Sequence, residues 1–212
     1  MEIRTYLHET LHLPPEMLEQ PLVEAIEIRT LKKGEPLIRQ GEAQEYVYIL
    51  VSGILRGFFL DAGGQEVTDC FAFRGGTPAL PGPDLTVPAP ISIEAISDVT
   101  VLCIPTSVVV QAMEENMAFL KCAYGFLMAS TKMHWELKLA RYRYGASQRY
   151  QWFLETYPGL IHKVSNKHIA SFLGMNPSTL SRPRSLLRDM IRRKREEEAE
   201  ISCAGPPPAP DK

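Results

Sequence analysis

The stretch from Val164 to Arg195 constrains this chain most, because it carries the start and stop signals of two consecutive short helices. Ser165 can cap a first helix through its hydroxyl, and Gly174 offers the positive φ that a tight exit needs. Asn176 followed by Pro177 is a second start signal, since proline at the first helical position loses no hydrogen bond. The pattern predicts a helix-turn-helix with these inner residues: Ile169, Ala170, Phe172, Leu173, Leu180, Leu187 and Ile191.

Positive charge is concentrated in the same part of the chain. Residues 141–195 hold twelve Lys and Arg against Glu155 and Asp189, a local net charge of +10 in a chain whose total is −2. This distribution directs phosphate attraction to the helix-turn-helix, although a solvated helix with a charged tail is the alternative. We predict that the DNA-binding residues are Ser165, Asn166, Lys167, Asn176, Pro177, Ser178, Thr179, Arg182 and Arg184.

Length and composition limit the remaining possibilities. The chain has 212 residues, enough for two small domains. It has no run of eighteen apolar residues and no apolar leader, so we expect a cytoplasmic protein without a membrane partner. The four cysteines show no C-x-x-C pair, which argues against a disulfide framework or an iron–sulfur site and favours small buried thiols at Cys70, Cys103 and Cys122.

The front of the chain, residues 1–115, is typical of an antiparallel β-roll. Short apolar segments are separated by turn residues such as Ser52-Gly53 and Ser97-Asp98. This spacing predicts an α+β protein with an N-terminal antiparallel roll (a double-stranded β-helix). The expected strands are 46–51, 54–60, 66–73, 91–96 and 99–104, with short helices at 14–25 and 105–113.

Residues 116–144 have a different pattern, with apolar side chains recurring every three or four positions. We predict one long helix whose apolar seam consists of Met117, Leu120, Tyr124, Leu127, Met128, Thr131, Trp135 and Lys138. The seam suits pairing with a second copy, because a twofold dimer places two recognition helices about one DNA turn apart. Packing within one chain is the alternative.

A helical domain is expected over residues 145–195. Gly145 and Ala146 form a plausible hinge, and Ser147 can cap a helix that Pro158-Gly159 ends before the helix-turn-helix begins. Residues 196–212 combine clustered acids with three consecutive prolines, so we expect a disordered tail.

This order of elements resembles the Crp-Fnr superfamily of bacterial transcription regulators from about Leu22 to Lys194. The most specific segments are Tyr46-Val-Tyr-Ile-Leu-Val-Ser-Gly53, Ser147-Gln-Arg-Tyr150 with Tyr157-Pro-Gly159, and Ile169-Ala-Ser-Phe-Leu-Gly174 through Thr179-Leu-Ser-Arg182. The resemblance implies a homodimer whose roll senses a signal, whose long helices form the interface, and whose terminal domains read a pseudopalindromic promoter site. It also implies RNA polymerase as a partner.

Carried over from the family, Pro177, Ser178 and Arg182 would face the bases, and Asn176, Thr179 and Ser165 would lie near phosphates. The family often has arginine and glutamate where this chain has Pro177 and Ser178, so the common half-site cannot be assumed. Pro183 removes a helical hydrogen bond, and we predict a bend across residues 179–187. Acids and prolines follow Arg195 directly, so we expect the helix-turn-helix domain to lack a full wing, the strand hairpin that family members commonly add after the second helix.

The expected effector is not cAMP. Cyclic-nucleotide members use a glycine-glutamate turn, a short helix and an Arg-Ser or Arg-Thr pair, whereas the loop 74–90 has five prolines and Ala89-Pro90 in place of the pair. Arg56 and Arg74 are the local anion partners that remain, and a cyclic-nucleotide sensor stays an alternative. Another small molecule could bind between roll and long helix near Tyr46, Phe58, Phe71, Arg74, Tyr124, Thr131 and Trp135, although each of these also suits ordinary core or interface.

Two other function classes compete with a DNA-binding regulator. A cupin-type enzyme would need metal ligands in the roll, but all five histidines lie outside residues 28–104, so we expect neither catalysis nor a metal or other cofactor. A regulator that acts through protein contacts, with degenerate DNA binding, is the closer alternative, given Pro183 and the missing wing.

Overall fold

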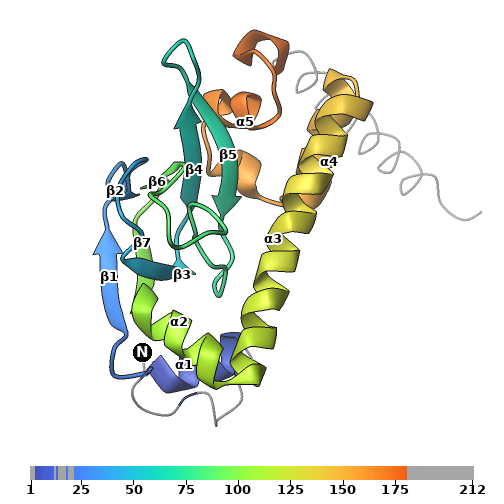
Figure 1. Cartoon of the computed structure of the whole chain (residues 1–212). Helices are drawn as coiled ribbons and strands as arrows, with labels where there is room; N and C mark the ends of the chain where they lie inside the picture. The colour runs from blue at the N-terminus through green and yellow to red at the C-terminus, as the bar shows by residue number, and fades with distance from the viewer. Residues whose placement is uncertain (1–2, 12, 14–17, 19–21, 181–212) are drawn as a thin grey trace, which may run out of the picture.

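The computed structural model describes residues 3–11, 13, 18 and 22–180, which form a β-roll, a long helix and a helical head in chain order (Figure 1). We call residues 27–105 the roll and residues 145–180 the head. The roll contains β1 (Glu27–Leu31), β2 (Pro36–Ile38), β3 (Tyr46–Ser52), β4 (Leu55–Leu60), β5 (Glu66–Ala72), β6 (Ser92–Ala95) and β7 (Val99–Pro105).

The strands form two antiparallel sheets, in the orders β1-β7-β3 and β2-β6-β4-β5. A buried apolar cluster between them uses residues of the roll alone, from Leu31 to Cys103. Gly53 makes the turn from β3 to β4 at φ +95°, and a Cβ there would lie 2.3 Å from the Asp98 carbonyl oxygen, so only glycine fits. The predicted antiparallel roll and α+β class are confirmed, with β1 and β2 as strands that the sequence pattern did not indicate.

The helices are α1 (Ile3–Leu11), α2 (Thr106–Glu115), α3 (Met117–Arg143), α4 (Ala146–Thr156) and α5 (Asn166–Phe172). Helix α1 was not predicted; Leu7 packs with Val47, Ile49 and Leu102 of the roll. The helix predicted at 14–25 lies mostly outside the described residues, and its last part, 22–25, is a turn.

Helix α3 confirms the predicted long helix within one residue at each end. Its N-cap is Asn116, whose side-chain oxygen accepts hydrogen bonds from the amides of Ala118 and Phe119. It runs from α2, beside the roll, to the head (Figure 1). The apolar seam is largely exposed on it: Met117, Leu120, Tyr124, Leu127, Met128 and Trp135 all have more than 40% of their surface accessible.

The start of α4 corrects one prediction. The N-cap is Gly145 rather than Ser147, and the Gln148 side chain accepts a hydrogen bond from the Gly145 amide at 3.0 Å. Glycine is an acceptable cap, and the helix begins at Ala146, within the predicted hinge. It ends at Thr156, just before Pro158-Gly159 as predicted, and Gly159 is left-handed at φ 79°.

Cys70, Cys103 and Cys122 are free thiols; Cys103 is buried as predicted, whereas Cys70 and Cys122 are partly buried. Burial raises the pKa of Cys70 to about 12 and that of Cys103 to about 11, so both are protonated and unreactive near neutral pH. Within the described part of the chain, no helix is long and apolar enough to cross a bilayer.

Candidate nucleic-acid interface

The first helix of the predicted helix-turn-helix is α5. Its N-cap is Ser165, whose hydroxyl oxygen accepts a hydrogen bond from the His168 amide at 3.3 Å. The side chains predicted to be internal are fully enclosed, with Ile169, Ala170, Phe172 and Leu173 at 0% exposure. The cap and the apolar spacing were therefore sufficient to predict this helix.

The turn and the second helix start also match the sequence signals. Gly174 is left-handed at φ 62°, and its amide donates to the Ser171 carbonyl at 3.0 Å. Residues 177–180 are helical, and the Leu180 amide donates to the Asn176 carbonyl at 3.2 Å. Leu180 is 1% exposed and anchors this turn in the core of the head.

The predicted DNA-binding residues that the structure describes lie on the surface. Ser165, Asn166 and Lys167 start α5, and residues 176–179 start the next helix; all seven are exposed. Arg182 and Arg184, the Pro183 bend, Leu187, Ile191, the wing and the tail lie outside the described residues. The described part of the predicted site therefore consists of two exposed helix starts, residues 165–167 and 176–179; we call the second the reading tip.

Two arginines of the basic stretch have a structural role instead. Arg141 donates through Nε and Nη2 to the Phe172 carbonyl, at 3.0 and 2.6 Å, and Arg149 donates to the Leu173 carbonyl at 2.9 Å. These cations satisfy orphan carbonyls at the C-terminus of α5 and interact favourably with its dipole. The sequence count of twelve cations therefore overstates the charge that faces a phosphate backbone.

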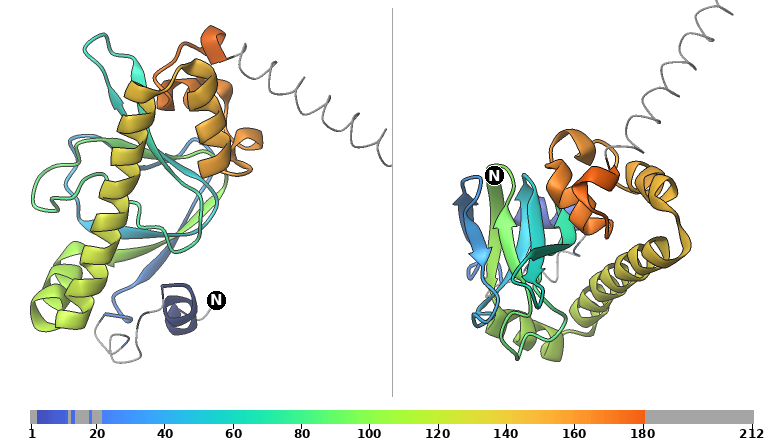
Figure 2. Two further views of the ribbon diagram at one scale, coloured as in Figure 1. Left: turned by 90° about the vertical axis from the view of Figure 1, so that its right-hand side faces the viewer. Right: turned by 90° about the horizontal axis from the view of Figure 1, so that it is seen from above.

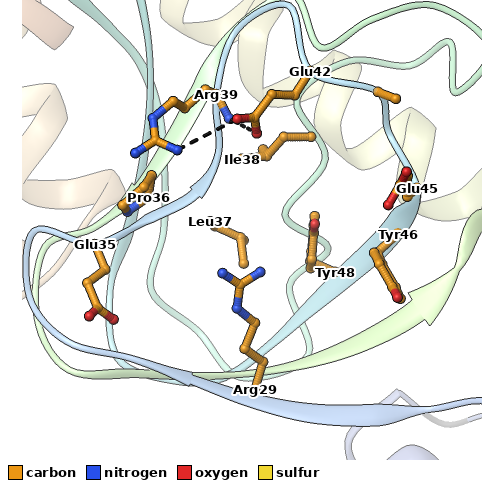
Figure 3. A pocket seen from close by; sticks show the side chains of 11 residues that line it. Arg29, Glu35, Pro36, Leu37, Ile38, Arg39, Glu42, Glu45, Tyr46 and Tyr48 are labelled. Atoms are coloured by element: carbon orange, nitrogen blue, oxygen red, sulfur yellow. Dashed lines mark hydrogen bonds and ion pairs between the residues drawn. The ribbon is translucent and has the colours of Figure 1, made fainter.

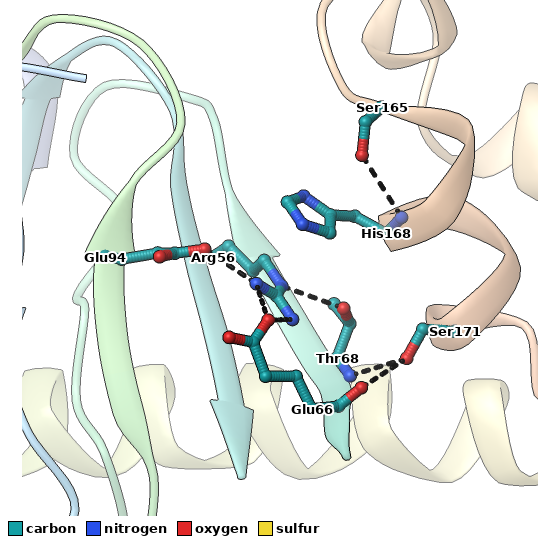
Figure 4. A network of polar contacts seen from close by, with 7 residues as sticks. All are labelled: Arg56, Glu66, Thr68, Glu94, Ser165, His168 and Ser171. Carbon is teal, nitrogen blue, oxygen red and sulfur yellow. Dashed lines mark hydrogen bonds and ion pairs between the residues drawn. The ribbon is translucent and has the colours of Figure 1, made fainter. Parts of the chain in front are cut away.

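A buried arginine lies on the side of the roll that faces the head. Arg56 of β4 is 1% exposed; its guanidinium donates to Glu66 at 2.9 and 3.0 Å, to Glu94 at 2.6 Å and to the Thr68 hydroxyl at 2.9 Å. It also lies over the Phe58 ring at 4.4 Å. The His168 ring of α5 is turned toward this network (Figure 4). Burial, and secondarily the Arg56 charge, lower the pKa of His168, so it is neutral at pH 7.

The same contacts bear on anion binding in the roll. Arg56 donates four hydrogen bonds to protein acceptors, and Arg74 is exposed with its guanidinium 5.3 Å from the Phe73 ring. Residues 74–90 contain no helix, as the prolines predict. The loop instead bonds along β3, with the Ala79 amide donating to the Tyr48 carbonyl at 2.8 Å, and it buries Ala79 and Ala89 in the core of the roll.

A hollow of about 680 Å³ opens at another place on the roll, lined by residues of β1, β2 and β3 (Figure 3). Tyr46 and Tyr48, with ring centroids 6.2 Å apart, line it together with the Arg29 guanidinium. Glu35, Glu42 and Glu45 also line it, and Arg39 pairs with Glu42 at 3.6 Å. Because both charges are present, the lining does not by itself select an anion or a cation.

The seven residues predicted for an effector pocket are not brought together. Tyr46 lines the hollow, Phe58 lies under Arg56, and Phe71 packs on Phe172 of the head. Arg74 is an exposed loop residue. Tyr124, Thr131 and Trp135 are exposed on α3. Among the described residues, no group of three or more His, Cys, Asp and Glu is placed to hold a metal ion.

Comparison with known proteins agrees with this architecture. A model of the cyclic nucleotide-binding domain matches residues 28–116, which comprise the roll and α2. The structure is similar to that of FixK2 from Bradyrhizobium japonicum, with a TM-score of 0.72 at 22% identity over 78% of this chain and 85% of that one. It is also similar to a putative Crp/Fnr-family transcriptional regulator from Eubacterium rectale, with a TM-score of 0.67 at 16% identity over 88% of each chain.

A sequence relative is the transcriptional activator protein Anr of Pseudomonas protegens, 39% identical over 77 residues. The match takes in 36% of this chain and about a third, 31%, of Anr. The roll is thus a cyclic nucleotide-binding-type domain joined to a helical head. The chain as a whole has the fold of the FixK2 and Eubacterium rectale structures.

Proposed function

We propose that the chain is a homodimeric, cytoplasmic bacterial transcription regulator that reads a pseudopalindromic promoter site and contacts RNA polymerase. The observation that carries this proposal is the exposure of residues 176–179 at the start of the helix that follows α5. Helix α5 itself buries its apolar side completely in the head. A helix N-terminus with hydroxyl and amide side chains suits entry into a major groove. The relative Anr, named a transcriptional activator, supports the same function.

Dimerisation is proposed through the apolar seam of α3. Six large apolar side chains of this seam are more than 40% exposed, which is unusual for a surface that stays in water. A second copy related by a twofold axis covers the seam with an identical seam and gives two heads for two half-sites.

The signal is proposed to act on the roll and to be a small molecule other than cAMP. Support comes from the loop 74–90, which has no helix N-terminus for a phosphate, and from Arg56, whose donors are already taken by Glu66 and Glu94. A regulator that acts through protein contacts alone is the second candidate, because Pro183 falls within the predicted reading helix and proline disfavours a helix interior.

Selection from random duplexes with the purified full-length chain tests the proposal, with cell extract supplied as a source of inducer. Recovery of a twofold-symmetric sequence is expected; recovery of no duplex favours the second candidate. Arg182→Ala should relax preference at one guanine by about 1–3 kcal/mol, because a guanidinium can bond O6 and N7 together. Lys167→Ala is the control, since loss of a phosphate contact should weaken all duplexes similarly.

A further inference from the structure

Strand β5 is an edge strand of its sheet, so one row of its backbone groups has no strand partner. In an antiparallel strand the N–H and C=O of one residue point to the same side. The Thr68 amide donates to Ser171 Oγ of α5 at 2.9 Å, and the Thr68 carbonyl accepts from Arg141 Nη2 at 3.5 Å. Residues of the head and of the end of α3 thus form hydrogen bonds with the free backbone groups of Thr68 at the edge of the roll (Figures 1 and 4).

The contact continues through apolar side chains. Phe71 of β5 packs on Phe172 of α5 with ring centroids 5.3 Å apart, and Phe172 also meets Phe153 of α4 at 5.9 Å. Ile54 and Phe71 of the roll belong to the same buried cluster as the core of the head. The roll therefore supplies part of the hydrophobic core on which α4 and α5 pack.

The described residues of the head share their core with the roll. All of residues 145–180 are described, and they contain helices and turns but no strand. In the buried cluster around the head, Ile54 and Phe71 come from the roll and Leu137 comes from α3. The enclosed Phe172 of the head would lose one of its aromatic partners if β5 moved away.

We propose that the roll and the head form one packing unit joined along the edge strand β5, and that Ser171 and Arg141 are the positioning residues that hold α5 on this strand. A small molecule or partner that displaces β5 then changes the position of the reading tip directly, without a movement of α3. The consequence for DNA rests on the proposed function, whereas the packing unit does not.

Amide hydrogen exchange at Thr68 in the full-length protein tests the packing unit. Ser171→Ala removes the acceptor of the Thr68 amide and leaves a good helix former in α5. We expect exchange at Thr68 to become about 5-fold faster, as for one lost hydrogen bond, with the amides of β3 and β7 unchanged. Ser147→Ala, at an exposed serine of the same head, is the matched control and should leave Thr68 unchanged. Equal Thr68 exchange in wild type and Ser171→Ala overturns the proposal.

A second measurement tests the coupling to DNA. Coupling between two sites is reciprocal, so a bound specific duplex should slow Thr68 exchange in wild type and have a smaller effect in Arg141→Gln. A duplex that binds tightly but leaves Thr68 exchange unchanged overturns the coupling. Failure to bind any duplex refutes the proposed function and the coupling together, while the exchange of Thr68 in the free protein still decides whether β5 belongs to the head.

Discussion

The roll and the head differ in where their cores come from. The central cluster of the roll draws all its buried members from residues 31–103, so the two sheets enclose it themselves. The cluster of the head includes Ile54 and Phe71 from the roll and Leu137 from α3. The difference teaches that a domain boundary drawn along the sequence at Gly145 is not a boundary in packing.

Helix α3 shows the same contrast along its own length. Its first two thirds expose the apolar seam, whereas Leu137 and Ala140 near its end are at most 4% exposed. The first part is available to a second copy, and the last turns are committed to the head and roll of their own chain. One helix thus carries both the seam of the proposed dimer interface and a contact within the chain.

The largest effect is expected for Phe71→Ala. This roll residue belongs to the core of the head, so removing its ring should lower the free energy of unfolding by about 3–5 kcal/mol. Trp152 of α4, followed by fluorescence in a Trp135→Phe background, should report the loss during denaturant unfolding. Phe59→Ala, at a partly buried phenylalanine of β4, is the control. An unchanged Trp152 transition in Phe71→Ala would show that the head folds independently.

The sequence could predict those parts of the fold whose conformation depends on residues close by in the chain. The Ser165 cap, the left-handed Gly174, the start at Pro177 and the span of α3 each depend on residues within a few positions, and all agree with the structure. Strand β1 was missed because four of its five residues are exposed, so it has no alternating pattern. Strand β2 has three residues, too few for any period.

The contacts between roll and head could not be predicted, because they join residues about a hundred positions apart. Ser171 and Thr68 are 103 positions apart, and neither has a neighbour pattern that indicates the other. Arg141 and Arg149 were counted with the DNA-facing charge because a sequence shows charge but not its partner. Their partners are carbonyls at the end of α5, which only the folded chain brings within reach.

A second prediction tests the exposed part of α3. Leu127→Glu places a charge in the seam of both copies of a dimer, and lost burial of two leucines should weaken association by on the order of 3 kcal/mol, about 100-fold. Sedimentation equilibrium measures it. Ala129→Glu is the matched control, since Ala129 is exposed on the opposite side of the helix and should leave association unchanged. Equal association of both variants with wild type would remove the seam from the interface.

The smallest effect concerns the hydrogen bond that ties α3 to β5. His134 Nε2 lies 3.0 Å from Asp69 Oδ2, and this contact raises the pKa of His134 above its usual value of 6.5. Protonated His134 pairs with Asp69, so its contribution to stability is complete below about pH 6.5 and is lost as pH rises through the raised pKa. His134→Gln should therefore lower the Tm by on the order of 2 °C near pH 5.5, the size expected for a partly exposed pair, and much less near pH 9.

His168 lies on the same interface, and its pKa is shifted in the opposite direction to that of His134. Its pKa is lowered, chiefly by burial, so the packed roll and head disfavour its protonation and lose stability as pH falls below about 6.5. His168→Gln should flatten the acid side of the Tm profile, whereas His134→Gln should steepen the decline toward acid. If both variants shift the profile in the same direction, the two histidines do not titrate as the packing of β5 between α3 and α5 requires.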